Sequence, residues 1–269
     1  MASIPSKVAT RLVAGIKRYQ SILAGAKSRD LGEADTVRII TDMLADVFGY
    51  DKFVEITSEF AIRGTYCDLA IKLDAVIQSL IEVKAIGLDL KDSYVKQAVD
   101  YAANQGVDWV VLTTGIVWRI YKVTFTKPID QELVVEFNFC DLNPKRTEDI
   151  ELLYLFAKEG WVKSALGDFE TQKQALSRFF LGQLVISDPV LDMIRRELRR
   201  MSPDVRIERE QIRGVLLAEV LKREVVEGEK AEEARKKISR AANRALRAKT
   251  AKDEIPPAAN DKSAPVSLE

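Results

Sequence analysis

The chain is 269 residues long, and its 47% hydrophobic and 30% charged residues are typical of a globular protein with one large domain or a core domain and an appendage. Its 41 basic and 41 acidic side chains balance, so net charge selects no class of partner. Histidine is absent, which excludes histidine-activated nucleophiles, HExxH zinc sites and histidine-ligated deaminases, and leaves chemistry to carboxylates, lysine, tyrosine or serine.

Two amphipathic helices are expected first, over residues 3–27 and 33–48, because apolar residues recur at helical spacing in both. In the second helix, Glu33 lies one turn before the apolar stripe that contains Val37 and Ile40. A glutamate in a first turn is favoured by the helix dipole alone, but a carboxylate on the core-facing line is an unusual placement. Glu33 is therefore a candidate functional residue, with an ordinary first-turn glutamate as the alternative.

Residues 65–85, TYCDLAIKLDAVIQSLIEVKA, predict two strands joined by a turn, because apolar and polar side chains alternate along both. Glu82 and Lys84 are two residues apart, so their side chains lie on the same side of the sheet. The turn sets Asp68 opposite Glu82, provided that the loop is odd, such as residues 74–76, because cross-strand neighbours share a face. An even loop without a bulge would place the two carboxylates on opposite faces.

Two carboxylates and an ammonium on one face have a chemical meaning. Neighbouring carboxylates repel each other unless a cation or a proton lies between them, and oxygen ligands suit a hard ion such as Mg²⁺. Such an ion polarises a phosphoryl oxygen and lowers the pKa of water, while a nearby ammonium orients the water or offsets developing charge. The alternative is a half-exposed hairpin on which Glu82 and Lys84 are ordinary surface residues.

A mixed sheet with helices against it is expected, because a strand precedes the hairpin and a helix and three strands follow it. The ranges are 53–62 for the first strand, 90–104 for the helix, and 107–113, 116–125 and 132–139 for the later strands. In the helix, Gln97 interrupts an apolar stripe that includes Tyr101. A buried amide needs hydrogen-bond partners, which a nucleotide or phosphate would supply; the alternative is a core amide bonded to Tyr101.

The pattern changes to helices after residue 147. They are expected over residues 148–158, 172–184, 189–201 and 208–222. The third and fourth could form a DNA-reading helix-turn-helix, with ordinary packing plus a solvated basic face as the alternative. A helix-prone segment over residues 230–252 follows, and it is rich in basic residues that suit non-specific phosphate contacts, among them Arg235, Lys236, Lys237 and Arg240. Residues 255–269 are expected to be disordered.

The expected subcellular location follows from features that the sequence lacks. Cys67 and Cys140 are too few for a disulfide framework, and Cys67 lies inside an expected strand. No apolar run reaches the length of a membrane span, and charges interrupt the N-terminus too often for a signal peptide. We therefore expect a cytoplasmic protein without a membrane partner.

The order of these motifs resembles the PD-(D/E)xK nuclease superfamily, in which a helix with Glu, a strand with Asp, a strand with Glu-x-Lys and a helix with Gln-x-x-x-Tyr follow one another. More narrowly, residues 32–34 (GEA), Asp68, residues 82–84 (EVK) and residues 97–101 (QAVDY) resemble the N-terminal nuclease domain of type I restriction enzyme R subunits. The resemblance covers about residues 30–125. It implies an α/β (α+β), restriction-endonuclease-like fold with a mixed central sheet flanked by helices.

The resemblance also implies roles for individual residues. Asp68 and Glu82 would ligate Mg²⁺, for which Mn²⁺ would substitute, and Lys84 would assist the attacking water. Glu33 would support the metal site, while Gln97 and Tyr101 would help to place DNA. We expect a nuclease core over residues 1–145, a helical region over 146–228 and a basic segment with a tail over 229–269.

The chain departs from the family pattern in two places. Cys67 stands where the superfamily's name has Pro, and no G-x-x-x-x-G-K-[ST] motif of an ATP-driven motor is present. The expected protein is thus a Mg²⁺-dependent endonuclease of restriction or defence that acts alone, as a homo-oligomer or with other subunits of a restriction system. The alternatives are a non-catalytic DNA-binding or regulatory protein on the same fold, and a helical oligomerisation scaffold.

Overall fold

The computed structural model describes residues 3–62, 65–125 and 128–253, and the side chains of residues 59–62, 65, 66, 92, 97 and 244–253 lie outside that description. The tail expected to be disordered, residues 255–269, also lies outside it. The chain divides into two compact units, Met1–Glu170 and Thr171–Glu269, and the division falls within the helix α6 (Ala165–Ala175).

The first unit is built on a six-stranded sheet whose spatial order, β1-β2-β3-β4-β5-β6, is the order along the chain. The strands are β1 (Ile56–Ile62), β2 (Thr65–Leu73), β3 (Val76–Val83), β4 (Trp109–Thr113), β5 (Val117–Thr124) and β6 (Asp130–Asn138). Among the described strands only the β3–β4 pair is parallel, and the helix α3 (Asp92–Gln105) crosses between these two strands. The expected mixed α/β sheet is confirmed.

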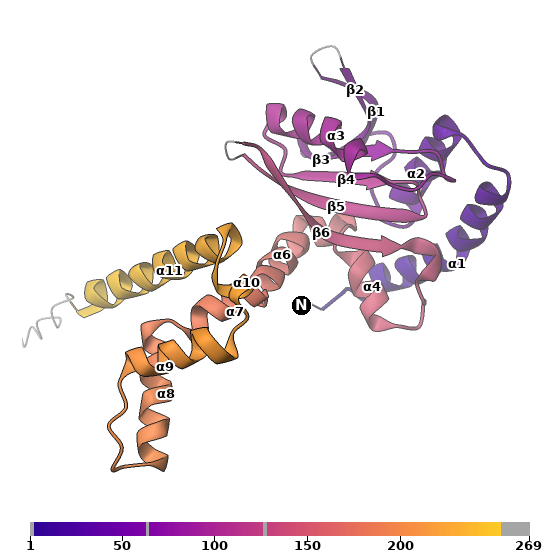
Figure 1. Ribbon diagram of the computed structural model, residues 1–269. Coiled ribbons are helices and arrows are strands. Elements are labelled where there is room, and N and C mark those ends of the chain that lie inside the picture. The colour runs from indigo at the N-terminus through magenta and orange to yellow at the C-terminus, as the bar shows by residue number, and fades with distance from the viewer. Residues whose placement is uncertain (1–2, 63–64, 126–127, 254–269) are drawn as a thin grey trace, which may run out of the picture. The chain divides into compact units, whose positions relative to one another are not determined.

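Helices cover both faces of this sheet (Figure 1). One face packs against α1 (Ser6–Ser28), α2 (Glu33–Asp46) and α4 (Thr147–Tyr154) around a large apolar core that contains Leu69, Ile81 and Trp118. On the other face, α3 packs against a smaller cluster that includes Leu80 and Val110. The alternating pattern of the strands therefore buries both sides of the sheet, and the site must lie at an edge or an end.

The first unit extends to Glu170 rather than to the predicted boundary after residue 145. Leu153 and Phe156, which lie in α4 and directly after it, are fully buried in the larger core. The next helix, α5 (Lys158–Val162), is fixed by Glu159, whose carboxylate accepts two hydrogen bonds from Arg11 of α1 at 2.6 and 2.8 Å. These helices complete the core of the sheet, so the boundary lies after them.

The hairpin differs from the expected odd loop. Its turn holds two residues, Asp74 and Ala75, whose φ angles are +51° and +64°, as in the turns that match strand twist. A bulge restores the register, because the pairing moves one step along β2, from Ile71 to Lys72, while it moves two steps along β3, from Ser79 to Ile77. A two-residue turn combined with a bulge therefore places the carboxylates of Asp68 and Glu82 on the same face of the sheet, as an odd loop would.

The described part of the second unit consists of helices joined by turns and short connections. They are the end of α6, then α7 (Arg178–Val185), α8 (Asp188–Met201), α9 (Arg209–Val215) with a following π-helical turn (Leu216–Val220), α10 (Arg223–Val226) and α11 (Glu229–Asp253). The helix expected over 172–184 is broken because the Ser177 hydroxyl accepts a hydrogen bond from Phe180 N–H and caps α7. Within the described ranges, no helix has the length and apolar character needed to span a membrane.

Two of the arginines on the basic face of α8 pair with acidic side chains of the same unit, and a third binds a backbone carbonyl. Arg195 pairs with Asp192 at 3.0 Å, Arg200 pairs with Glu197 at 2.8 Å, and Arg199 donates to the carbonyl of Ile207 at 3.0 Å. Charges already paired with acids attract phosphate weakly. The arrangement favours the packing alternative over DNA reading by α8 and α9.

Candidate active site

The candidate site lies where β2 and β3 separate. Their ladder pairs Leu69 with Ile81, and one step further the chain reaches Asp68 on β2 and Glu82 on β3. There the Asp68 side chain takes the place of a strand partner, because Val83 N–H donates to its Oδ2 at 2.7 Å. We call this point of separation, at Asp68 and Glu82, the β2–β3 fork. It fixes the Asp68 carboxylate against the backbone of β3, beside Glu82.

Lys84 joins three segments of the chain. Its Nζ donates to Glu82 Oε1 at 2.8 Å and to Glu33 Oε2 at 3.3 Å. The backbone N–H of Lys84 donates to the carbonyl of Thr113 at 2.9 Å, which continues the parallel pairing of β3 with β4. The N-terminus of α2 and the end of β3 thus meet at the Lys84 ammonium, while the end of β4 holds the Lys84 backbone.

Exposure separates the roles of these side chains. Glu82 is 8% exposed, and the Lys84 side chain is 17% exposed. The Glu33 side chain is 48% exposed, so it does not face the core as its place on the helical stripe predicted. The structure instead places Glu33 at the solvent-exposed side of the site, where its carboxylate accepts a hydrogen bond from the Lys84 ammonium.

Burial dominates the electrostatics of the two inner carboxylates. It raises the pKa of Asp68, while the Val83 N–H and the charge of Lys84 act in the opposite direction. Burial also raises the pKa of Glu82, opposed by the hydrogen bond from Lys84 and reinforced by the charge of Asp68. Both carboxylates thus bind a proton more readily than they would in water. A cation placed between them would relieve the same unfavourable energy.

Lys84 remains charged in this setting. Burial acts to lower its pKa, but the hydrogen bond and charge of Glu82, together with Glu33 and Asp68, outweigh burial and raise it. An ammonium has three N–H donors, and in the described part of the chain two carboxylates accept from Lys84. One donor is left for a water or a phosphoryl oxygen.

Cys67 is a neighbour of the site and not a reactive member of it. It is fully buried, and its Sγ donates to the carbonyl of Ile81 at 3.2 Å. Burial, and then the charges of Glu82 and Asp68, raise the pKa of the thiol to about 12. A group that stays a thiol at neutral pH is a poor nucleophile.

The donor set suits one kind of cation. Across the described residues, no group of three or more aspartate, glutamate or cysteine side chains could hold a metal ion. Asp68 and Glu82 therefore offer two carboxylates and no third side-chain ligand. That number fits Mg²⁺, which keeps several of its waters and is commonly held by one or two carboxylates and the phosphate of a substrate.

The remaining predicted residues lie elsewhere. Tyr101 of α3 is 8% exposed and belongs to the apolar cluster beneath that helix. Gln97 also lies on α3, and its side chain is outside the described set. The four basic residues, Arg235, Lys236, Lys237 and Arg240, are exposed on α11 of the second unit, and Lys237 donates to Gln174 Oε1 at 2.8 Å. The structure brings together only Glu33, Asp68, Glu82 and Lys84 among the described side chains.

Two contributors to the site were not predicted from the sequence. The first is the Val83 N–H, whose role depends on the separation of the strands and carries no side-chain signal. The second is Arg119 on β5, which donates to the carbonyl of Leu90 at 3.0 Å and so anchors the loop that follows Lys84. Glu82 of β3 and Arg119 of β5 lie in the same row of residues across the sheet, with β4 between them. Only the order of the strands in the sheet reveals this relation.

Comparison with known proteins does not identify the chain: no family model, no curated protein and no solved structure matches it.

Proposed function

We propose that this protein is a Mg²⁺-dependent nuclease that hydrolyses DNA phosphodiester bonds at Asp68, Glu82 and Lys84. The observation that carries the proposal is the fork of β2 and β3, where two partly buried carboxylates meet a charged lysine. A solvated surface hairpin would not bury a glutamate to 8% exposure beside a second carboxylate, because burial of like charges is unfavourable. Such a cost is typical of a functional site.

The arrangement of elements supports a restriction-endonuclease-like fold for the first unit. Glu33 opens α2, Asp68 and Glu82 lie on adjacent antiparallel strands, and α3 then crosses to a parallel strand. This is the order that the sequence resemblance implies. The fold, like the activity, is a proposal.

The carboxylates would hold the cation, with Mn²⁺ as a substitute for Mg²⁺. A divalent ion there supplies the polarisation of a phosphoryl oxygen and of water that phosphodiester hydrolysis requires. Val83 N–H holds the Asp68 carboxylate in place, and Lys84 holds that of Glu82, so both are oriented before substrate arrives.

Lys84 has a different task from the carboxylates. Glu82 and Glu33 fix its ammonium from two sides, and the remaining N–H would donate to the attacking water or to a phosphoryl oxygen that gains charge. Glu33 is a positioning residue in this scheme, because it acts through Lys84. Tyr101 is buried and would support α3, while Gln97 on that helix would contact DNA.

The wider setting rests on the resemblance alone. We place the protein in restriction or defence, in the cytoplasm, acting with other subunits of a restriction system or without them. These 269 residues hold no phosphate-binding motif of an ATP-driven motor, so the proposed cleavage does not draw on ATP-driven translocation by them. The exposed basic residues of α11 would add non-specific contacts to phosphates.

The direct test is a cleavage assay on closed-circular plasmid and linear single strands, with Mg²⁺ or with a chelator. Wild-type protein should cleave only with the metal, and Asp68→Asn should lose cleavage by about a hundredfold or more, a loss comparable to that of other key electrostatic groups. The matched control is Asp108→Asn, which removes a carboxylate paired with Lys122 at 2.7 Å just before β4, at the other end of that strand.

The outcomes separate the candidate functions. Loss of cleavage in Asp68→Asn but not in Asp108→Asn supports the nuclease. DNA binding by wild-type protein without cleavage under any metal would instead favour the non-catalytic DNA-binding protein on the same fold. Equal cleavage by wild-type and Asp68→Asn protein would show that the activity lies elsewhere.

A further inference from the structure

The second unit has almost no core of its own. Both apolar core clusters consist of residues from the first unit. Among the described residues after 170, the buried hydrophobic side chains are Leu191, Ile212, Ala231 and Ala234. Two of these are alanines. Burial of apolar surface is the main contribution that offsets the conformational entropy lost on folding. A helical unit of this size that buries so little apolar surface therefore lacks most of that contribution.

The apolar residues of this unit are instead exposed. Val215 is 52% exposed, Leu217 is 40% exposed and Val220 is 62% exposed, all in α9 and the π-helical turn that follows it. Leu181 and Leu184 on α7 are 43% and 38% exposed. Exposed apolar side chains concentrated in neighbouring elements are typical of an interaction surface.

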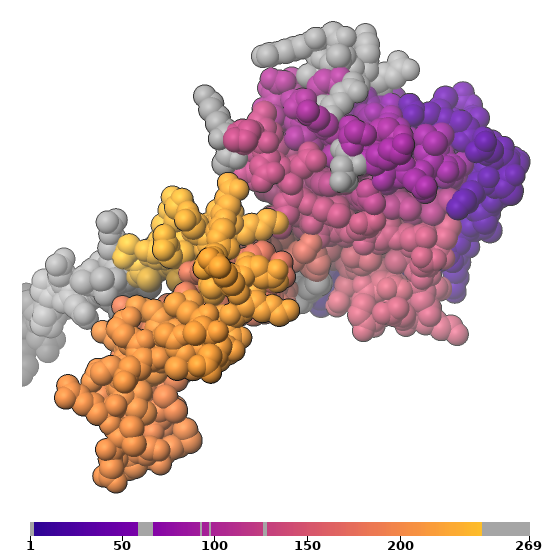
Figure 2. All heavy atoms as spheres, viewed as in Figure 1, coloured from indigo at the N-terminus to yellow at the C-terminus, as the bar shows by residue number. Residues whose placement is uncertain are grey.

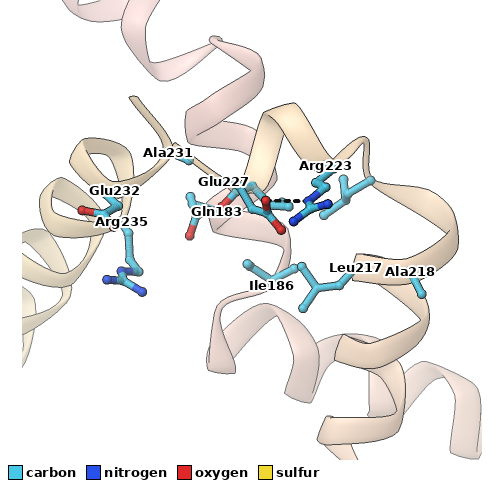
Figure 3. A pocket seen from close by; sticks show the side chains of 11 residues that line it. Gln183, Ile186, Leu217, Ala218, Arg223, Glu227, Ala231, Glu232 and Arg235 are labelled. Carbon is cyan, nitrogen blue, oxygen red and sulfur yellow. Dashed lines mark hydrogen bonds and ion pairs between the residues drawn. The ribbon is translucent and has the colours of Figure 1, made fainter. Parts of the chain in front are cut away.

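A cavity of about 540 Å³ lies among α7, the π-helical turn, α10 and the first turns of α11 (Figure 3). Its apolar lining includes Ile186, Leu217, Leu221 and Val226. Gln183, 8% exposed, is fixed at its wall because its Nε2 donates to the carbonyl of Val226 at 3.1 Å. These elements are the orange and yellow segments of Figure 2, and the whole cavity belongs to the second unit.

The rim of this cavity carries both signs of charge in equal number. Arg223 pairs with Glu227 at 2.6 Å, and Glu232 and Arg235 lie one turn apart on α11. A rim without net charge does not select an acidic partner such as a nucleic acid, or a strongly charged protein. Under a two-fold rotation, however, arginines of one copy can face glutamates of the other, because an isologous interface must be self-complementary.

We propose that a second copy of this chain covers the apolar cavity, so that the protein dimerises through its second unit. The surface includes Leu217 in its apolar lining and carries Arg223, Glu227, Glu232 and Arg235 as its charged residues. Association supplies the apolar burial that the unit lacks alone. The proposal does not depend on nuclease activity, since it uses no residue of the β2–β3 fork.

The test is the mass of the full chain by sedimentation equilibrium over a wide range of concentration. Wild-type protein should be a dimer that dissociates on dilution. Leu217→Glu should raise the dissociation constant at least about tenfold, which corresponds to ~1.4 kcal/mol. The matched control, Met193→Glu on α8, adds the same charge at a residue that is 55% exposed and does not line the cavity, and it should leave the constant unchanged.

A charge exchange tests the rim separately from the apolar lining, and spectroscopy checks that each variant stays folded. Arg223→Glu should weaken the dimer, because it places glutamates on both sides of the interface, and Arg223→Glu/Glu227→Arg should restore it. Trp109, Trp118 and Trp161 all lie in the first unit, so tryptophan fluorescence reports whether that unit stays folded, while circular dichroism reports the helices. A chain that is monomeric at every concentration, or a dimer that tolerates Leu217→Glu and Arg223→Glu, would overturn the proposal and leave the cavity to a different partner.

Discussion

The pH dependence of stability is a direct consequence of the burial of Asp68. Its pKa in the folded protein is raised above the ordinary value of 3.8, mainly by burial. A group whose pKa is raised by folding stabilises the protein below its unfolded pKa, and this contribution is lost as pH rises through the folded pKa. Above that pH, the charged carboxylate destabilises the fold in the absence of metal.

We therefore expect Asp68→Asn to melt at a higher temperature than wild-type protein at neutral pH without metal. The difference should be smallest below pH 3.8 and should grow as pH rises, because only the wild-type side chain ionises. An asparagine still accepts the hydrogen bond from Val83 N–H, so the fork stays intact. Thermal melts of both proteins across this pH range measure the effect. A difference independent of pH would contradict the account.

Some of the site could be predicted from individual residues, and some could not. The alternation of side chains places Glu82 and Lys84 on one side of a strand, and the structure joins them at 2.8 Å. The contact of Asp68 with the Val83 N–H could not be predicted, because it forms only where two paired strands stop pairing. The exposure of Glu33 was also missed, since a helical stripe does not show where the partner surface ends.

At the scale of elements, the hairpin turn carries backbone strain that a glycine would relieve. Ala75 has a φ of +64°, in the left-handed region that disfavours side chains with a β-carbon. Asp-Gly is a preferred pair for this turn. We expect Ala75→Gly to raise the free energy of unfolding by roughly 0.5–1 kcal/mol, measured by urea denaturation. A decrease would show that the turn is not strained in solution.

The elements themselves were largely predictable, but their irregularities were not. Strong period-2 and helical patterns gave the strands, the crossover helix and the long helices. The bulge at residues 77–79 depends on the fit of β3 to both of its neighbours, which a single strand's pattern does not contain. The break before α7 was missed because the hydrogen bond from Phe180 N–H to Ser177 competes with a continuous helix.

At the scale of the whole molecule, the basic residues of α11 predict a salt-dependent affinity for DNA. Lys236 and Arg240 are exposed one helical turn apart. If both contact phosphates, Lys236→Gln/Arg240→Gln should reduce the slope of log affinity against log salt by roughly 0.9 for each contact removed from a duplex. Fluorescence anisotropy at several salt concentrations measures the slope.

The control for this slope is Arg200→Gln, because that guanidinium is paired with Glu197 at 2.8 Å on α8. It should leave the slope nearly unchanged. An unchanged slope in Lys236→Gln/Arg240→Gln as well would assign α11 to protein contacts rather than to DNA. Neither variant alters the apolar lining of the cavity in the second unit, so oligomerisation is tested separately.

The division of the chain shows the limit of sequence reasoning at this scale. The change from strands to helices after residue 147 was visible in the pattern, but the first helices after it belong to the core of the sheet. Only packing shows that Leu153 and Phe156 are buried there. The sparse core of the second unit was likewise hidden, because amphipathic helices look the same whether or not a partner covers them.

If two carboxylates hold a cation while Lys84 acts on the reaction, one variant separates these roles. Lys84→Met removes an ammonium that repels the cation and occupies Glu82, so Mg²⁺ should raise the melting temperature of this variant at least as much as that of wild-type protein. Its plasmid cleavage should fall by about a hundredfold or more. Retained cleavage, or loss of the Mg²⁺-dependent shift, would contradict the assignment of Lys84.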